Sequence, residues 1–156
     1  MKKKLFSLVI LAVIIAIFSI TNSHNSNDEK IIEGFLNEYF KQIHLNERDF
    51  AKIVESEENI KDFIENSNFD KYLTEKELSR LVLNREIPCK KFQNLSDNYN
   101  YKISKINKLD SNKYEVIIEF LGENTIDVRM IDTKDGRKID YIDVAKLNEK
   151  LADFEN

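Results

Sequence analysis

Residues 113–142 read KYEVIIEFLGENTIDVRMIDTKDGRKIDYI, and this stretch decides the fold. Apolar and polar residues alternate in three runs, a period of two that is typical of half-buried β-strands. The breaks, 122–124 and 133–136, are short and rich in turn residues, and the Asp135-Gly136 pair tolerates the positive φ of a tight hairpin. Because a parallel crossover needs about a dozen residues or more, these connections predict antiparallel neighbours. A similar alternation at Tyr99, Tyr101 and Ile103 adds a strand, so the sequence predicts a meander of about four strands.

The alternation also assigns each residue to one of the two faces of the sheet. The nearly uniform apolar set is expected to face the core, and it consists of Tyr114, Val116, Ile118, Phe120, Ile126, Val128, Met130, Ile139 and Tyr141. The opposite face mixes charged residues with four aliphatic ones, Ile117, Leu121, Ile131 and Ile142. Two interpretations of these four remain open: a dimer or partner contact, or scattered aliphatic residues on an outer sheet.

Helical periodicity dominates the chain before the strands. Apolar residues from Ile31 to Ile43 recur at helical spacing and form the strongest amphipathic pattern, preceded by Asn27 or Asp28 as a cap. Gly34 within this helix indicates the close approach of a neighbour. Further helices are expected after caps at Asn46, Ser56, Thr74 and Asp143; Thr74 forms a capping box with Glu77, and the last helix runs from residue 144.

The first 23 residues have the composition of an export signal. Lys2, Lys3 and Lys4 precede an uncharged apolar stretch over residues 5–20, and Thr21 and Ser23 supply small residues for cleavage after Ser23. Sixteen residues of helix span roughly 24 Å, less than the ~30 Å hydrocarbon core of a bilayer. This length favours a cleaved signal peptide over a retained single-pass anchor, and both place residues 24–156 outside the cytoplasm as one domain.

Composition excludes several classes of protein. The chain has 156 residues, 24 basic and 28 acidic, and its net charge of −4 argues against a nucleic-acid binder. A single cysteine, Cys89, excludes an intrachain disulfide framework; outside the cell its thiol is a candidate for an intermolecular disulfide. The two histidines, His24 and His44, lack the spacing of a metal site, so no metal or cofactor is expected.

Carboxylates gather along the final hairpin at Asp127, Asp132, Asp140 and Asp143. Converging carboxylates bind calcium or perform acid–base chemistry. Asp127 and Asp140 share the charged outer parity, however, so solvated side chains paired across the strands are the favoured interpretation.

The order of elements resembles the nuclear-transport-factor-two-like superfamily, a cone-shaped α+β fold also called cystatin-like. The resemblance rests on the Ile31–Ile43 helix, the Tyr72-Leu73-Thr74 entry to a later helix, and the closing hairpin with its strand Gly136–Ile142, and it covers residues 27–144. It implies a pocket between the opening helix and the concave sheet. The ring residues expected there, as ligand contacts or as core filling, are Phe35, Tyr39, Tyr114, Phe120 and Tyr141.

These observations predict an α+β domain in which N-terminal helices pack on a C-terminal antiparallel meander of about four strands, preceded by a signal or anchor helix. Fold alone does not choose a function. With no catalytic constellation in the sequence, we expect a non-enzymatic, exported or envelope-tethered bacterial protein that binds a protein or a small molecule. The alternatives are an accessory subunit of an envelope assembly and an isomerase-like or hydrolyase-like enzyme of the same fold. Contact with a membrane is expected only through residues 5–20.

Overall fold

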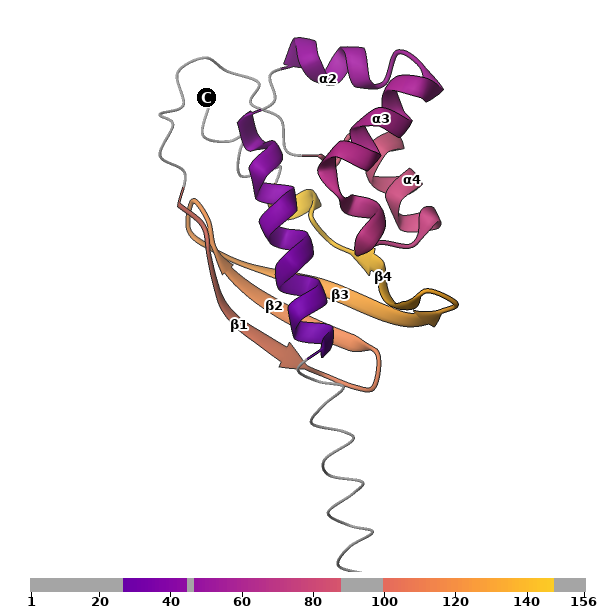
Figure 1. The fold of residues 1–156 in the computed structure, drawn as a ribbon. Helices are drawn as coiled ribbons and strands as arrows, with labels where there is room; N and C mark the ends of the chain where they lie inside the picture. Colours follow the sequence, from indigo (N-terminus) through magenta and orange to yellow (C-terminus); the bar gives the residue numbers. More distant parts are fainter. Residues whose placement is uncertain (1–26, 45–46, 88–99, 148–156) are drawn as a thin grey trace, which may run out of the picture.

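The computed structural model describes residues 27–44, 47–87 and 100–147. It confirms an α+β architecture in which helices come first and a four-stranded antiparallel sheet follows (Figure 1). The opening helix covers residues 27–41. The remaining helical elements are η1 (Gln42–His44), α2 (Glu47–Ile53), α3 (Glu57–Ser67), η2 (Phe69–Lys71) and α4 (Glu75–Leu83). The strands are β1 (Lys102–Lys108), β2 (Lys113–Glu119), β3 (Glu123–Thr133) and β4 (Gly136–Ile142).

Two of the predicted helix caps are confirmed. The side chain of Ser56 accepts a hydrogen bond from the amide of Asn59 at the start of α3. Thr74 accepts one from the amide of Glu77 at the start of α4, at 3.2 Å. Each side chain satisfies an amide that has no partner inside its own helix, which fixes where the helix begins.

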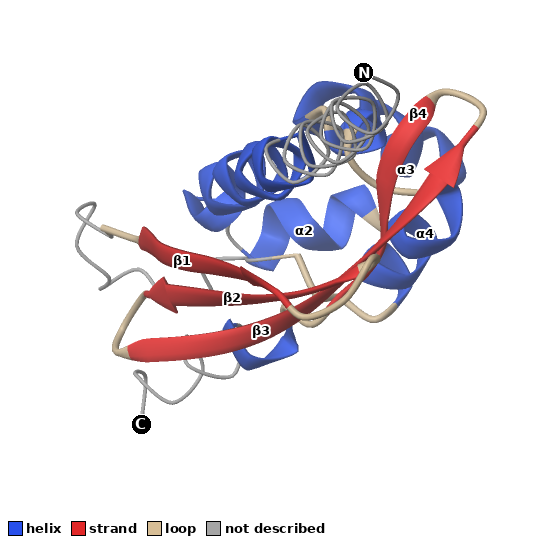
Figure 2. Cartoon of the chain, turned by 90° about the horizontal axis from the view of Figure 1, so that it is seen from below, coloured by secondary structure: helices blue, strands red, loops and turns tan. Residues whose placement is uncertain are grey.

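The sheet is a simple meander with the order β1-β2-β3-β4, as its short connections require. The labelled helices lie on one side of it (Figure 2). Gly136 in the β3–β4 turn has a φ of 110°, the left-handed conformation that the Asp-Gly pair predicts.

The side of β4 that faces away from β3 is paired at one residue, by a parallel bridge between Leu73 and Ile139. The amide of Thr74 donates to the carbonyl of Ile139 at 2.9 Å, and the amide of Ile139 donates to the carbonyl of Tyr72 at 2.8 Å. The segment between η2 and α4 therefore pairs with the last strand along its free side.

Residues on the inner face of the sheet and the opening helix share one hydrophobic core. Every predicted inward residue of β2 and β3 is at most 2% exposed, and so are Ile32, Phe35, Leu36 and Tyr39 of the opening helix. A β-carbon on Gly34 would lie 2.5 Å from a ring carbon of Tyr72. The close approach expected at Gly34 is confirmed, and its partner is that ring.

Two expectations about β4 are wrong because the strand contains an irregularity. Arg129 of β3 pairs with Tyr141, whereas Met130 pairs with Ile139, so Asp140 is an extra residue in the ladder. An extra residue shifts every following side chain to the other face. Ile142 is therefore fully buried in the core rather than on the outer face, and Tyr141 lies on the outer side, half-buried, rather than in the core.

Several predictions fall outside the described residues: the signal or anchor over residues 1–23, the cap at Asn46, His24, Cys89 and Tyr99. The predicted last helix is described only over residues 145–147, where Val144 and Leu147 join the core. Among the described helices, none is both long and apolar enough to cross a membrane.

Candidate functional site

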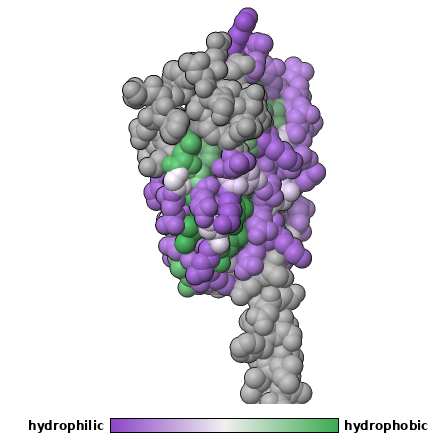
Figure 3. Space-filling model, turned by 90° about the vertical axis from the view of Figure 1, so that its left-hand side faces the viewer, coloured by the Kyte–Doolittle hydropathy of each residue, from purple (hydrophilic) through white to green (hydrophobic). Residues whose placement is uncertain are grey.

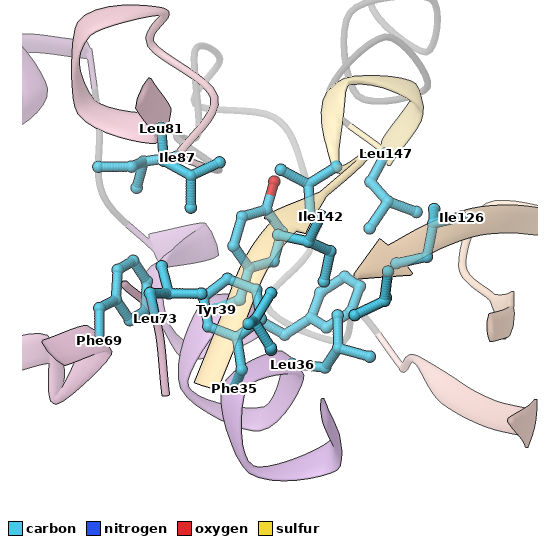
Figure 4. Packing of buried hydrophobic residues seen from close by; sticks show 14 of the residues in the cluster. Phe35, Leu36, Tyr39, Phe69, Leu73, Leu81, Ile87, Ile126, Ile142 and Leu147 are labelled. Atoms are coloured by element: carbon cyan, nitrogen blue, oxygen red, sulfur yellow. The ribbon is translucent and has the colours of Figure 1, made fainter. Parts of the chain in front are cut away.

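Four of the five predicted ring residues lie in the shared core, between the opening helix and the sheet. Phe35, Tyr39, Tyr114 and Phe120 are each at most 2% exposed. The rings of Phe35 and Tyr39 have centroids 5.7 Å apart, and Figure 4 shows them packed among aliphatic side chains from the sheet and from α4. The hydroxyl of Tyr39 donates to the carbonyl of Glu86 at 3.0 Å. The structure thus brings these four rings to the expected place, and their role as ligand contacts stays a prediction.

The first polar cluster lies where the opening helix begins, and it joins that helix to the β1–β2 and β3–β4 hairpins. Asp28 is 1% exposed and accepts a hydrogen bond from the hydroxyl of Tyr114 at 2.7 Å. The guanidinium of Arg137 donates to the same carboxylate from Nε at 3.1 Å and from Nη2 at 3.1 Å. Arg137 also donates to the carbonyl of Ser111 and the side-chain oxygen of Asn112 in the β1–β2 turn. A buried carboxylate is thereby matched by a cation and a neutral donor.

The electrostatics of this cluster follow from burial. Burial raises the pKa of Tyr114 well above its ordinary value, and the hydrogen bond to Asp28 raises it further, because an ionised phenol would face the carboxylate. The hydrogen bonds to Asp28 likewise raise the pKa of Arg137. Tyr114 therefore keeps its proton and donates a hydrogen bond, and Arg137 keeps its positive charge.

The second polar cluster fastens α4 to the end of β4. Glu77 is 1% exposed, and its carboxylate accepts the amide of Ile142 at 2.8 Å. Arg80 donates to both carboxylate oxygens of Glu77 at 2.8 Å, to Glu86 at 2.7 Å, and to the carbonyl of Ile142 at 2.8 Å. The hydrogen bond to Glu77, followed by that to Glu86, raises the pKa of Arg80. The backbone groups of Ile142 are thus satisfied by an ion pair from a helix.

Tyr141, the fifth predicted ring residue, lies beside this second cluster. The guanidinium carbon of Arg80 is 5.0 Å from the centroid of its ring, and that of Arg129 is 5.9 Å away. Burial is the first cause that raises the pKa of Tyr141, and the charge of Asp143 is the second. The structure therefore separates Tyr141 from the four core rings and places it between two cations on the outer side.

Of the four carboxylates of the final hairpin, Asp132 and Asp140 pair with arginines across the strands, as the favoured interpretation expects. Asp143 pairs within its own segment, and Asp127 has no ion pair with a described cation. Asp132 lies 3.4 Å from Arg137, its partner across the strands, and Asp140 accepts from Arg129 at 2.8 Å. Asp143 lies 3.3 Å from Lys146, and Asp127 is exposed. Within the described part of the chain, no three histidine, cysteine or carboxylate side chains gather as metal ligands.

The sequence interpretation did not identify Asp28, Arg137, Glu77 or Arg80 as members of buried networks. The capping box identifies Glu77 in the sequence, and it predicts that the Glu77 side chain reaches back to Thr74. In the structure the amide of Glu77 donates to Thr74, but its carboxylate accepts from β4 instead. Nothing in local spacing joins residues as distant as 28 and 137.

The outer face of the sheet presents exposed side chains from several strands. Thr125, Asp127 and Arg129 of β3 are exposed. Ile117 of β2 and Ile131 of β3 are half-buried among them and do not belong to the core. This face consequently alternates aliphatic and charged side chains.

Neither a protein-family profile nor a curated protein matches the sequence. A crystal structure of a protein of unknown function from Bacteroides thetaiotaomicron is similar in fold, with a TM-score of 0.51. The two chains are 19% identical, and the alignment covers 80% of this chain and 94% of that chain. An identity this low shows a shared fold alone.

Proposed function

We propose that the chain is a non-enzymatic interaction or ligand-binding domain, exported to the bacterial cell envelope by residues 1–23. The three lysines followed by the apolar stretch over residues 5–20 support export. Cleavage after Ser23 releases the domain, and retention of the stretch tethers it at the outer side of the membrane.

One observation carries the interaction role: the outer face of the sheet holds Ile117 and Ile131, half-buried, among exposed charged residues. Aliphatic side chains that are enclosed by polar ones on an accessible surface suit a contact with a partner. The two buried polar clusters support the non-enzymatic part of the proposal. Their carboxylates and guanidinium groups are hydrogen-bonded to one another and to the backbone, so these groups serve to hold the structure together. They hold the opening helix and α4 on the sheet.

We also propose that the domain belongs to the nuclear-transport-factor-two-like fold. The opening helix across one face of a curved antiparallel meander supports this placement (Figure 1). In such a fold the space between helix and sheet is the ligand site. In this chain Phe35, Tyr39, Tyr114 and Phe120 occupy that space at exposures of at most 2%, which favours a partner on the outer face over a small molecule inside.

Export is tested by fusing alkaline phosphatase, which is active only outside the cytoplasm, to the C-terminus of the full chain. Activity is expected with residues 1–23 present and is expected to be lost when they are deleted. Equal activity without the leader contradicts export. Equal amounts of fusion protein on an immunoblot provide the control.

The interaction role is tested by a photo-crosslinking amino acid at Thr125, an exposed position on the outer face. The matched control is the same amino acid at Lys61 on α3, whose side chain is 76% exposed. We expect one defined adduct from position 125 in intact cells and none from position 61. The same adducts from both positions, or none from either, contradict a partner on the outer face.

A further inference from the structure

The two edges of the sheet differ. The free side of β4 is bridged by Leu73, as described above. At the other edge, β2 is the one described strand that pairs with β1. Lys102, Ser104 and Lys105 of β1 are exposed, and Ser104 is an extra residue that shifts the register against β2 while β2 keeps its own alternation. Among the described strands, β1 has no partner on its other side, which leaves this edge available to another strand.

The inward side chains of β1 are incompletely covered. Ile103 and Ile106 pair with Ile118 and Val116 of β2 and lie on the core side of the sheet. Their β2 neighbours are fully buried, whereas Ile103 and Ile106 are only half-buried. Figure 3 faces this side of the molecule and shows hydrophobic residues between hydrophilic ones. A further strand along β1 would bury the remaining flank of both isoleucines.

The charge of β1 determines what kind of strand can pair with it. Strand β1 carries three lysines and no acidic residue, although the chain as a whole is acidic at −4. Lys102 and Lys105 lie on the outer side, since they pair with Glu119 and Ile117. Lys105 has no ion pair with any described carboxylate, and Lys102 lies 3.6 Å from Glu119. A second copy added at β1 would place lysines opposite lysines, which is unfavourable across a strand pair.

Building on the proposed interaction role, we propose that β1 accepts, by strand addition, an extended acidic–aliphatic segment of a partner protein. Main-chain hydrogen bonds to β1 supply affinity, and alternate side chains supply specificity. The aliphatic residues of the segment cover Ile103 and Ile106. Its carboxylates, on the opposite side because successive side chains alternate, meet Lys102 and Lys105.

The test measures binding of fluorescent peptides to the full chain in mild detergent by anisotropy. The probe is Glu-Val-Glu-Val-Glu-Val-Glu, compared with Lys-Val-Lys-Val-Lys-Val-Lys and with the acidic peptide N-methylated at alternate amides. We expect the acidic probe to bind at least ~10-fold more tightly than either control, a difference of about 1.4 kcal/mol. Protection of the β1 amides from hydrogen exchange is expected with the acidic probe alone. Equal binding of the methylated peptide leaves only a charge effect and overturns the proposal, as does equal binding of the lysine peptide.

Charge reversal on the protein supplies the matched control. Lys102→Glu with Lys105→Glu is expected to invert the preference in favour of the lysine peptide. Lys61→Glu with Lys71→Glu, the same change of charge on α3 and η2, is expected to leave the preference unchanged. An unchanged preference in the β1 variant, or an inverted one in the control variant, overturns the proposal.

The result of the peptide-binding test can be distinguished from the result of the crosslinking test of the proposed function. Adducts from Thr125 together with no peptide binding retain the interaction role and overturn strand addition. Selective peptide binding with β1 protection, in the absence of adducts from Thr125, supports strand addition and moves the partner surface to the edge. Self-association of the full chain through β1 overturns the choice of an acidic partner.

Discussion

Gly34 shows how a single missing β-carbon shapes the packing of the opening helix. Gly34→Ala places a methyl group 2.5 Å from the ring of Tyr72. Overpacking of this kind costs about 1–3 kcal/mol, which exceeds the gain of about 1 kcal/mol in helix propensity. We expect a lower free energy of unfolding in urea, and a restored one when Tyr72→Leu is added. A variant with alanine alone that is more stable than the wild type contradicts the steric argument.

Asp28 is the residue on which the first polar cluster depends. Asp28→Asn leaves Arg137, whose side chain is 11% exposed, without its buried carboxylate, and the carboxylate that remains beside it, Asp132, is 84% exposed. Breaking a buried pair costs about 3–5 kcal/mol, whereas Tyr114→Phe removes one hydrogen bond for about 1–3 kcal/mol. We therefore expect the larger loss from Asp28→Asn, measured by chemical unfolding at neutral pH. Equal losses contradict a dominant role for the ion pair.

Tyr114 makes stability sensitive to alkaline pH. Its pKa is raised in the folded state by burial and by Asp28, so the protonated form is favoured by folding. The contribution is fully present below the unfolded tyrosine pKa of about 10 and is lost as pH rises toward the folded value. We expect the free energy of unfolding to fall above about pH 10, and to fall less in Tyr114→Phe. Absorbance at ~295 nm, a wavelength at which tyrosinate absorbs, follows the ionisation directly, and parallel curves for the two proteins contradict the assignment.

At the scale of elements, the irregularity in β4 decides which side chain enters the core. Ile142 is fully buried and Tyr141 is on the outer side. Ile142→Ala is expected to lower the free energy of unfolding by about 2–4 kcal/mol, and Tyr141→Phe to change it by less than about 0.5 kcal/mol. Thermal or urea unfolding of the two variants measures both effects. The reverse order of effects contradicts the shifted register.

The sequence predicts the elements well where the period of apolar residues is unbroken. The opening helix, the caps at Ser56 and Thr74, and the inward residues of β2 and β3 are all confirmed. The prediction assigns Tyr141 and Ile142 to the wrong faces of the sheet, because one extra residue at Asp140 reverses the alternation at the end of β4. That register accompanies contacts of Ile142 with Glu77 and Arg80, which lie more than 60 residues earlier.

The candidate site was predictable to a similar extent. The four core rings follow from the same alternation that predicts the strands. The ion pairs of Asp28 and Glu77 do not, because a charged residue in a helix reads locally as a solvated one. Only the tertiary arrangement brings Arg137 to Asp28.

At the scale of the whole molecule, the leader and the domain are expected to be separable. The contacts of Asp28 with Tyr114 and Arg137 tie the first turn of the opening helix to the sheet. A chain that begins at residue 24 should therefore unfold at the same denaturant concentration as the full chain. A chain that begins at residue 31 loses Asp28, and its free energy of unfolding should be about 3–5 kcal/mol lower. Equal stability of the two shortened chains contradicts the anchoring role of the first turn.

The bridge that Leu73 makes with β4 has a consequence for assembly. A sheet that can pair with another molecule at both of its edge strands can polymerise. A sheet with only one available edge strand can pair with a single neighbour. Among the described residues, the free side of β4 is already paired at Ile139 by the segment around Leu73, so we expect a further strand to add at β1 alone. If strands do add at β1, we therefore expect discrete one-to-one complexes rather than fibres.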